Sequence, residues 1–587
     1  MPIEKRWVVK PQGDPATAAM LAAALRISPV LANLLVQRGI DTVEKAEKFF
    51  KPSLADLHDP FLMKDMEKAV ERVERAVANQ EKIMVYGDYD VDGCTAVALV
   101  YKFLRQIGHK NLMFYIPDRY TEGYGISIKG IDLARKGVGL IIALDCGIKA
   151  TEKVVYAKTK GVDFIICDHH LPAEEIPKAV AVLDPKRVDC SYPFDELSGC
   201  GVGFKLVQAY AQKNRMPFEQ ILPLLDLLVV SIASDIVPLV GENRILAYFG
   251  LKNLNREPSK GLLSIIKICG LDKHNITIDD IVFKIGPRIN AAGRMRMDEN
   301  DENASPSGGH AAVELLIEGN ESIAEEFGSV IDAYNQDRKS IDRSVTQEAH
   351  DYIEGNPEMK ALKSTVIYNP RWMKGIVGIV ASRLIETYYR PTVVLTMSNG
   401  FVTGSARSVP GFDLYQAVES CSDLLENFGG HMYAAGLTMR PENVGEFTRR
   451  FNAYVEENID PQMLVPQVDI DSELLFSDIT PAFRKDLNRF QPFGPGNTAP
   501  VFATCGVSNH GDAKLVGMEC EHLRMDLMQR QKPNTKIQAI AFQQPTHYEW
   551  VRSGRPIDVC YQIVENHYRG TVTTQLRIKD IKPVLNR

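Results

Sequence analysis

The sequence lacks any long uninterrupted apolar run. Its longest apolar stretch, residues 221–240, is interrupted by Pro223, Asp226 and Asp235. Acidic residues and a proline make this stretch a poor membrane span, so we expect a buried helix here. The N-terminal residues MPIEKRWVVK also lack the basic segment and the apolar core of a signal peptide. These absences predict a protein that does not associate with membranes.

Closely spaced cysteines and an excess of positive charge are missing as well. Ten cysteines occur without a CxxC pair, which favours reduced thiols and a cytoplasmic protein. The formal net charge is -7, and this argues weakly against a general nucleic-acid-binding protein, because phosphate binding needs positive charge. Binding to DNA or RNA would therefore require a local basic surface.

The remaining composition and the hydrophobic pattern predict a soluble multidomain α/β protein. A chain of 587 residues, of which 45% are hydrophobic, suggests about three or four domains. Alternating apolar strands and helical segments between residues 83 and 184 predict a parallel sheet. The predicted domains are a helical N-terminal region (1–60), a parallel-sheet domain (61–297), an acidic loop with a long connecting helix (298–355), a second α/β domain (356–466) and a small β-barrel (467–587).

The stretch VYGDYDVDG, residues 85–93, carries three aspartates at alternate positions. Its first part matches the start of a calcium-binding EF-hand loop at Asp88, Asp90, Asp92 and Gly93. The EF-hand hypothesis fails because position 12 of the loop is Leu99 rather than glutamate, and because the apolar residues 83–86 before the loop predict a strand. The carboxylates therefore follow the carboxyl end of a buried strand.

Other predicted strands also end in acidic residues, namely Asp145, Asp168 and Asp184. In a doubly wound sheet, ligands bind beyond the carboxyl ends of the strands, so a cluster can form there from Asp90, Asp92, Asp145, Asp168, His169 and His170. Carboxylates with one or two imidazoles suit Mn²⁺ or Mg²⁺ better than zinc. We therefore expect a site for two divalent ions, in which Asp145 is the bridging ligand.

Motifs spread over most of the chain resemble the DHH phosphoesterase superfamily, and most closely its RecJ single-strand-specific exonucleases. The motifs are GDYDVDG (87–93), LDCG (144–147), DHH (168–170), SDIVPL (234–239), GPRINAAGR (286–294), GIVGIVASRL (375–384), GSARS (404–408), GGHMYAAG (429–436) and PFGPGN (492–497). The resemblance implies a DHH catalytic domain, a DHH-associated domain joined to it by a long helix, and a C-terminal OB-like barrel that binds nucleic acid.

The resemblance also implies roles for individual residues. It assigns the metals to Asp90, Asp92, Asp145, His169 and Asp235. His170 is expected beside the scissile phosphate, and Asp168 is expected to orient a histidine. Many superfamily members have a histidine four residues before the first of these aspartates, where this chain has Tyr86. Asp88 is the expected substitute ligand.

Four of these motifs supply candidate substrate-binding residues. GPRINAAGR offers Arg288, Asn290 and Arg294 as donors to phosphate oxygens, with Arg294 also a catalytic candidate, although arginines here could instead form structural ion pairs. In the DHH-associated domain, the resemblance implies phosphate or sugar contacts from Arg383, Ser405, Arg407 and His431. Arg383 could equally be an ordinary charge on a helix surface.

The C-terminal segment supplies the local basic surface. Residues 551–587 contain seven basic and three acidic side chains, together with Tyr561 and Tyr568. An OB-type barrel binds single strands through a basic groove and stacking aromatics. The two tyrosines could stack on bases, or they could belong to the core of the barrel.

The expected function is that of a metal-dependent exonuclease in DNA repair and recombination. By resemblance, it hydrolyses single-stranded DNA from the 5′ end to mononucleotides, as a monomer, with a single-strand-binding protein and a helicase as candidate partners. One alternative is a DHH-family phosphodiesterase acting on short RNA or small nucleotides. Another is a non-catalytic replication factor of the same fold. Chain length argues against the former, and the intact acidic and histidine positions argue against the latter.

Overall fold

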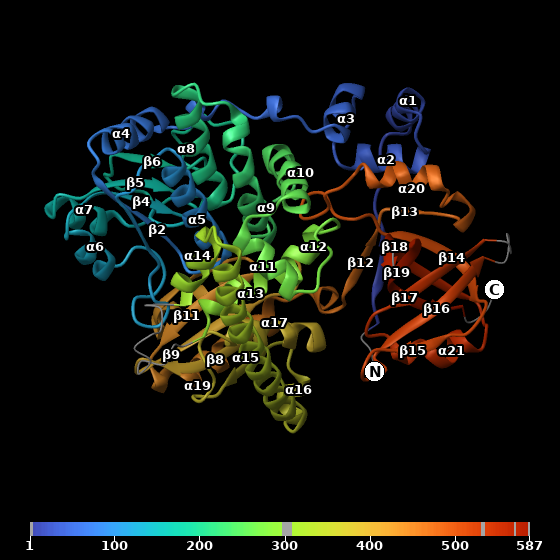
Figure 1. Cartoon of the computed structure of the whole chain (residues 1–587). Coiled ribbons are helices and arrows are strands. Elements are labelled where there is room, and N and C mark those ends of the chain that lie inside the picture. Colours follow the sequence, from blue (N-terminus) through green and yellow to red (C-terminus); the bar gives the residue numbers. More distant parts are fainter. Residues whose placement is uncertain (1–3, 296–307, 530–534, 569–570, 585–587) are drawn as a thin grey trace. The chain divides into compact units, whose positions relative to one another are not determined.

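The computed structural model describes residues 4–295, 308–529, 535–568 and 571–584 (Figure 1). The chain divides into two compact units. One consists of residues 52–341 and 492–497, and the other of residues 1–51, 342–491 and 498–587. No helix in the described ranges is long and apolar enough to cross a membrane.

The first unit is built on a parallel sheet with strand order β3-β2-β4-β5-β6. The strands are β2 (Lys82–Gly87), β3 (Leu112–Tyr115), β4 (Val138–Leu144), β5 (Asp163–Cys167) and β6 (Ala181–Leu183). β2 lies between β3 and β4 and pairs in parallel with both, and Gly87 at its carboxyl end is level with Leu144. The predicted parallel sheet is confirmed, and neighbouring strands end at the same edge.

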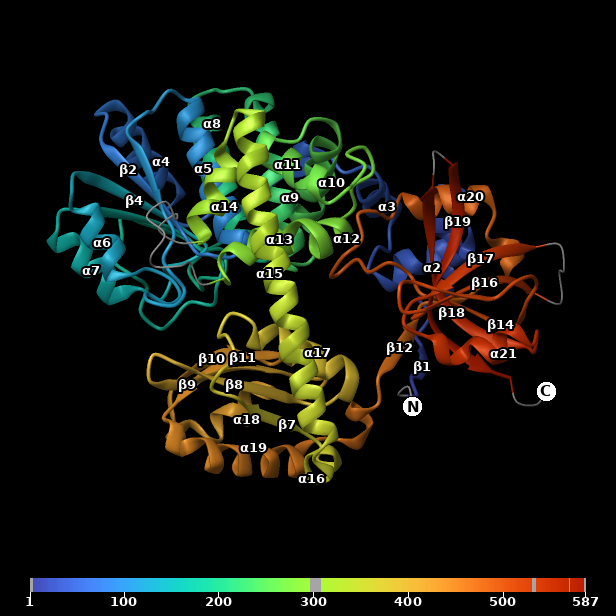
Figure 2. The same ribbon diagram turned by 60° about the horizontal axis from the view of Figure 1, so that its bottom comes forward.

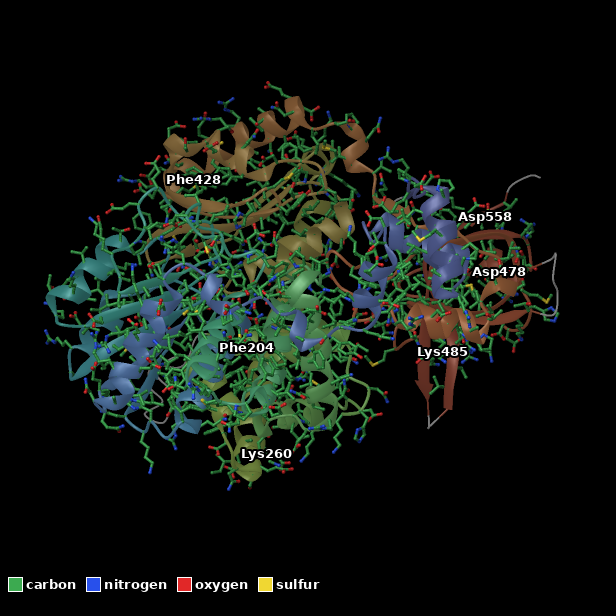
Figure 3. The ribbon with its side chains drawn as sticks, turned by 90° about the horizontal axis from the view of Figure 1, so that it is seen from above. Phe204, Lys260, Phe428, Asp478, Lys485 and Asp558 are labelled. Carbon is green, nitrogen blue, oxygen red and sulfur yellow. The ribbon has the colours of Figure 1, made fainter. Side chains whose placement is uncertain are left out.

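Helices cover both faces of this sheet (Figure 2). They are α4 (Met66–Ala78), α5 (Val91–Gln106), α6 (Ile128–Ala134), α7 (Thr151–Thr159) and α8 (Gly199–Lys213). Val85 packs in one core with residues of α4, α5 and α8, including Phe204 (Figure 3), whereas Tyr86 packs in the opposite core with residues of α6 and α7. Burial on both faces explains why the strands read as continuous apolar runs.

Further helices complete the unit, and they include the predicted connecting helix. They are α9 (Leu225–Ser234), α10 (Gly241–Arg256), α11 (Lys260–Ile268), α12 (Ile278–Asp280), α13 (Gly286–Ala292) and α14 (Gly308–Ile317). The predicted acidic loop lies mostly outside the described residues, and its last two residues, Gly308 and Gly309, belong to α14. The connecting helix expected from Ala311 onward is two helices, because the chain leaves α14 at Ile317 and starts α15 (Glu321–Glu354) after Asn320.

The second unit contains a mixed sheet with strand order β10-β11-β9-β8-β7. The strands are β7 (Thr365–Tyr368), β8 (Thr392–Ser398), β9 (Phe401–Arg407), β10 (Leu425–His431) and β11 (Ala434–Met439), and the helices are α16 (Pro357–Ala361), α17 (Val377–Tyr388), α18 (Leu414–Glu419) and α19 (Val444–Asn458). Residues of α18 and α19 pack with alternate strand residues in one core. Phe428, on β10, packs at the edge of that core (Figure 3).

The C-terminal part of the same unit is a closed barrel. Its strands are β14 (Phe502–Asn509), β16 (His522–Gln529), β17 (Lys536–Ala541), β18 (Ile557–Tyr568) and β19 (Thr571–Pro583). β14 pairs with both β16 and β18, β18 pairs with β19, and β17 joins β19 to β16. The short strands β13 (Ser472–Glu473) and β15 (Lys514–Val516) extend it, and α20 (Pro481–Asn488) and α21 (Tyr548–Arg552) accompany it. The OB-like architecture is confirmed.

The N-terminal segment packs with residues before the barrel. It contains α1 (Pro15–Leu25), α2 (Pro29–Gln37) and α3 (Val43–Phe50), as the sequence predicts, and also a strand, β1 (Arg6–Val9), that it does not predict. β1 pairs in parallel with β12 (Gln467–Ile470). Lys10 forms an ion pair with Asp471, and the ring of Phe50 lies 5.3 Å from that of Phe490.

Candidate active site

The acidic residues at the strand ends converge beyond the carboxyl edge of the parallel sheet. Asp88 and Asp90 follow β2, Asp145 follows β4, and Asp168 follows β5. Asp90 is also the N-cap of α5, where its carboxylate accepts the Gly93 N–H at 3.0 Å. The helix-capping role and a ligand role are compatible, because a carboxylate has several lone pairs.

The two histidines and the aspartates form overlapping groups that could each hold a metal ion. These groups are Asp145 with His169 and His170, Asp92 with His169 and Asp235, and Asp88 with Asp90 and Asp145. His169 Nε2 lies 3.2 Å from Asp145 Oδ1, 3.7 Å from Asp235 Oδ2 and 3.8 Å from Asp92 Oδ2. Asp145 and His169 each belong to two of these groups, and of the two only Asp145 has a carboxylate, whose two oxygens suit the predicted bridging role. Every residue predicted as a metal ligand is in this cluster.

The N-terminus of α8 and a serine of α9 hold the Asp92 carboxylate. Gly199 N donates to Oδ2 at 2.7 Å, and Cys200 N donates to Oδ1 at 2.8 Å. Ser231 Oγ also lies 2.7 Å from Oδ1, and it shares a hydrogen bond of 2.6 Å with Ser198 Oγ. The positive end of the α8 helix dipole thus faces the Asp92 carboxylate. Oδ2 keeps a lone pair on the side of His169.

Asp145 is placed by an unusual backbone conformation and by a close contact. Its φ is 58°, in the left-handed region that few residues other than glycine occupy. Its N–H donates to Cys167 O on the neighbouring strand. Gly199 approaches so closely that a Cβ there would lie 2.6 Å from the Asp145 Cβ. A glycine at position 199 therefore lets α8 reach the cluster.

The electrostatics of the cluster suit divalent cations. Burial, followed by the charges of neighbouring aspartates, raises the pKa of Asp88, Asp90 and Asp145, and it raises the pKa of Asp235 to about 9. Asp88 Oδ1, Asp145 Oδ1 and His169 Nδ1 are buried without a hydrogen-bond partner among the described residues. Such crowding of carboxylates is costly without positive charge. Burial lowers the pKa of His169, which leaves its ring neutral as a ligand.

Asp168 orients the two histidines. Its Oδ1 accepts the N–H groups of His169 and His170 and lies 2.7 Å from His170 Nδ1, while Oδ2 accepts Ile148 N–H. Burial alone would raise the pKa of Asp168, but the hydrogen bond and charge of His170 lower it to about 2. In return, the bond to Asp168 outweighs burial and raises the pKa of His170. His170 is thus suited to carry a proton.

Tyr86 and Asp88 lie in different surroundings. The Tyr86 ring is fully buried on the side of α6, and its hydroxyl donates to Gly125 O and accepts Ser127 N–H. Tyr86 belongs to the hydrophobic core on that side of the sheet, whereas Asp88 belongs to a candidate metal-binding group. The position of Asp88 agrees with the prediction that it is the substitute ligand.

The basic residues of GPRINAAGR lie on and after α13. The Arg288 guanidinium is bound to Asp332 Oδ1 at 2.8 Å and to Lys284 O, so the structural ion pair considered from the sequence is present. Asn290 is half-buried on α13. Arg294 follows the helix, and its carbonyl accepts the Tyr120 hydroxyl at 2.6 Å. Arg288 is therefore a weaker candidate for a phosphate donor than the motif suggested.

In the second unit, three of the predicted contacts lie on one face of the mixed sheet. Arg407 on β9 is paired with Ala434, which is paired with His431 on β10. Ser405 is two residues before Arg407, on the same face, and its Oγ accepts from Arg407 Nη1 at 2.8 Å. Residues opposite each other in antiparallel strands share a face, so the three side chains form one polar surface.

Arg383, the fourth predicted contact, is on helix α17 rather than on the sheet, and its guanidinium is bound to an acidic residue. Its guanidinium makes a bidentate ion pair with Asp342, with contacts of 2.7 to 3.1 Å, and Asp342 is fully buried. The pair fastens α17 to α15. Arg383 therefore has a structural partner that a substrate phosphate would have to replace.

The structure decides between the two alternatives for one of the barrel tyrosines. Tyr561 is fully buried, and its hydroxyl shares a 2.8 Å hydrogen bond with that of Thr504. It belongs to the core of the barrel and cannot stack on a base. The Tyr568 side chain lies outside the described ones. Among the basic residues, Arg555 and Lys582 lie over the rings of Trp550 and Trp7.

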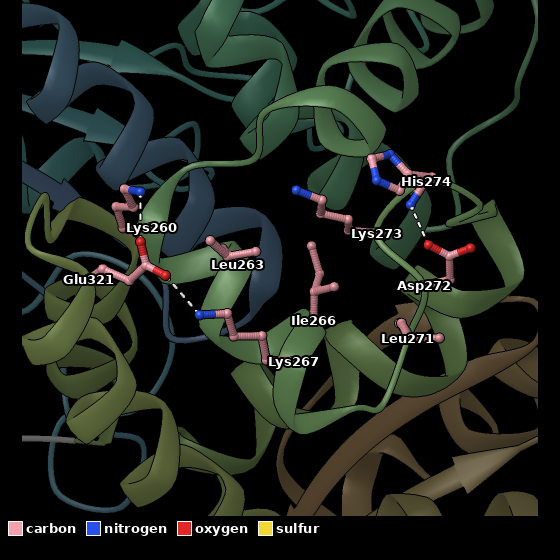
Figure 4. A pocket seen from close by; sticks show the side chains of 9 residues that line it. All are labelled: Lys260, Leu263, Ile266, Lys267, Leu271, Asp272, Lys273, His274 and Glu321. Atoms are coloured by element: carbon pink, nitrogen blue, oxygen red, sulfur yellow. Dashed lines mark hydrogen bonds and ion pairs between the residues drawn. The ribbon is translucent and has the colours of Figure 1, made fainter.

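A surface hollow of about 670 Å³ lies elsewhere in the first unit (Figure 4). It is lined by Lys260, Leu263, Ile266, Lys267, Leu271, Asp272, Lys273, His274 and Glu321. Both Lys260 and Lys267 are paired with Glu321, at 2.9 and 2.7 Å. No predicted site residue lines this hollow, and two of its lysines are already paired with a carboxylate.

Sequence reasoning missed Tyr124, Ser231 and Gly199. Tyr124 Oη lies 3.2 Å from His170 Nε2, in the loop after β3. The same rule about strand ends could have indicated Tyr124, because its loop leaves the carboxyl end of a strand. Nothing local marks Ser231 or Gly199, which reach Asp92 from more than one hundred residues away.

Three family models match the chain. The DHH family N-terminal domain matches residues 82–232, the DHHA1 domain matches residues 360–457, and the RecJ OB domain matches residues 470–580.

Whole-chain relatives extend this match over nearly the full sequence. The chain is 36% identical to a single-stranded-DNA-specific exonuclease RecJ of Bacillus subtilis, over 98% of this chain and 70% of that one. It is 32% identical to the protein of that name from Haemophilus influenzae, over 95% of this chain and 96% of that one. A solved structure of RecJ from Thermus thermophilus in complex with Mn²⁺ has a TM-score of 0.81 and 25% identity, covering 99% of this chain and 80% of that one.

Proposed function

Because the chain belongs to the family of RecJ single-stranded-DNA-specific exonucleases, we propose that it hydrolyses single-stranded DNA to mononucleotides from the 5′ end, in DNA repair and recombination. The observation that carries the proposal is the buried cluster of aspartates with His169 and His170. The 5′ polarity and the repair role rest on the family resemblance alone.

We propose that the cluster holds two ions of Mn²⁺ or Mg²⁺. The proposed ligands are Asp88, Asp90, Asp92, Asp145, His169 and Asp235, with Asp145 between the two ions. The raised pKa values of the carboxylates and their unpaired buried oxygens support this assignment, and relatives have been solved with Mn²⁺ and with Mg²⁺. When bound, such ions supply an activated water and neutralise the phosphoryl oxygens.

The side chains that are not proposed as metal ligands bind the substrate or transfer protons. His170, held by Asp168, donates a hydrogen bond or a proton to an oxygen of the scissile phosphate. Arg294 is the proposed donor to that phosphate, with Arg288 and Asn290 nearby on α13. Ser405, Arg407 and His431, together with Arg383 of α17, are the proposed contacts to phosphate or sugar along the strand.

The proposed division of the chain assigns these tasks to domains. Residues 61–297 form the catalytic domain, residues 356–466 form the substrate-binding domain, and residues 467–587 form the nucleic-acid-binding barrel. The helical region 1–60 and the connecting residues 298–355 complete the chain. We propose that it acts as a monomer, in the cytoplasm, with a single-strand-binding protein and a helicase as partners.

The test is digestion of end-labelled single-stranded DNA, duplex DNA and RNA with Mn²⁺, Mg²⁺ or EDTA. We expect metal-dependent release of mononucleotides from linear single strands and resistance of duplex DNA and of single-stranded circles. Preference for dinucleotides or short RNA would favour the phosphodiesterase alternative. Absence of hydrolysis with every metal, together with DNA binding, would favour the non-catalytic alternative.

A further inference from the structure

Ile236, which follows the candidate ligand Asp235, has a backbone conformation that isoleucine rarely adopts. Helix α9 ends at Ser234 with Asp235 as its C-cap, and Ile236 comes next with φ 62°. The left-handed position after a helix is usually glycine or asparagine, because a Cβ is strained there. A β-branched residue at positive φ is a stronger outlier still. The backbone at position 236 therefore does not favour an isoleucine.

The fold gains little from the Ile236 side chain either. The residue is 62% exposed, whereas Val237 and Leu239 in the same segment are 8% and 1% exposed. Stabilisation by an apolar side chain is proportional to the area it removes from water. Backbone conformation and burial thus leave the choice of isoleucine unexplained.

The position of Ile236 suggests a role in substrate binding. The carboxylate of the preceding residue, Asp235, lies 3.7 Å from His169 Nε2 in the metal-binding cluster. Two other large exposed side chains adjoin His170, one in sequence and one through a contact. Leu171, which follows His170, is 58% exposed, and Tyr124, which contacts His170, is 52% exposed. A phosphodiester held at the cluster brings its nucleoside to this apolar border.

We propose that Ile236 packs against the nucleobase next to the scissile phosphodiester. The inference rests on the proposed function, since it takes single-stranded DNA as the substrate. Strained backbone conformations cluster at active sites and ligand-binding segments, and Ile236 is the β-branched residue among the described non-glycine residues at positive φ. The contact would be independent of sequence, because every base presents an apolar face, and it would position the nucleotide without touching the reacting atoms.

The test compares Ile236→Gly and Ile236→Asn, which both fit the left-handed backbone, with Ile236→Val, which keeps an apolar β-branched side chain. The measurements are KM and kcat on a single-stranded oligonucleotide, the Tm and the Mn²⁺ titration. For the Gly and Asn variants we expect KM to rise on the order of tenfold, with Tm and the Mn²⁺ titration not impaired. The Val variant should keep a KM near that of the wild type.

Gln80→Gly is the matched control. Gln80 also has a left-handed backbone, with φ 51°, but it precedes β2 at the end of the strand opposite the cluster. Removing its side chain should leave KM unchanged. A KM rise in this control as large as that of Ile236→Gly would mean that relief of strain, rather than loss of a contact, weakens binding, and would overturn the inference.

Oligonucleotides with abasic residues at the terminal positions identify the contacted group. On these substrates the difference in KM between wild type and Ile236→Gly should disappear, and an equal rise in KM on abasic and ordinary DNA would overturn the base contact. Unchanged KM on ordinary DNA would reject the inference alone, and would leave Ile236 as a contact for a protein partner. A wild type that hydrolyses no single-stranded DNA would reject the proposed function and the inference with it.

Discussion

Replacing Ser231 by alanine tests whether the orientation of Asp92 controls metal affinity. Ser231 Oγ is buried and lies 2.7 Å from Asp92 Oδ1. A hydrogen bond to a charged group contributes roughly 1.5 to 3 kcal/mol. Because the N–H groups of Gly199 and Cys200 still hold the carboxylate, we expect the lower end, about 1.5 kcal/mol.

That free energy corresponds to about a tenfold loss of metal affinity, since about 1.4 kcal/mol is a factor of ten. This size agrees with the roughly 10- to 100-fold effect of removing a group that orients a metal ligand. The assay is the Mn²⁺ dependence of hydrolysis. The half-saturating concentration should rise about tenfold, and saturating Mn²⁺ should restore most of the rate, because Ser231 does not reach the substrate.

Ser234→Ala is the matched control for Ser231→Ala. Ser234 is on the same helix next to Asp235, and its Oγ is buried without a hydrogen-bond partner among the described residues. The same chemical change should therefore leave the Mn²⁺ dependence intact. An unchanged half-saturating concentration for Ser231→Ala, or a lost rate that excess Mn²⁺ does not restore, would refute the reasoning.

Three further substitutions probe the cluster. Asp145→Ala should abolish hydrolysis and leave DNA binding measurable by fluorescence anisotropy, because the bridging position organises both ions; near-normal activity in Mn²⁺ would contradict a two-metal site. Asp88→Ala should weaken Mn²⁺ binding in calorimetric titration by about tenfold or more, and an unaltered titration would return Asp88 to a structural role in its loop. Gly199→Ala should inactivate the enzyme without touching substrate, because its Cβ would lie 2.6 Å from the Asp145 Cβ; full activity would show that α8 can shift freely.

The sequence predicts the parallel sheet and its acidic edge well because both depend on local patterns. A strand buried on both faces is a short apolar run, and the residue that ends it lies at the edge where ligands bind. Asp88, Asp145 and Asp168 could be placed in this way without any knowledge of contacts. The helices α14 and α15 are predicted as one, although Gly319 and Asn320 between them are residue types that end one helix and cap the next; the continuous helical pattern on both sides outweighs this signal.

Contacts between distant parts of the chain could not be predicted, and they determine how well the site is organised. β1 pairs with β12 more than 450 residues later, and a strand of four residues carries no signal of such a partner. The burial of Tyr561 could not be predicted for a similar reason. Alternation in a strand indicates which residues share a face, but it does not indicate which face packs in the core.

The two left-handed residues at the cluster show where local rules fail for a functional reason. Asp145 and Ile236, with φ of 58° and 62°, both occupy a conformation that propensity assigns to glycine. For Asp145 the cost accompanies a carboxylate placed between two ligand groups. For Ile236, which is 62% exposed, burial of the side chain offsets little of the cost, and the proposed contact with a base would offset it. In Ile236→Asn, a gain in Tm with a loss of substrate affinity would show that the isoleucine strains the backbone and contributes to substrate binding. A loss of both Tm and affinity would mean that the isoleucine stabilises the fold.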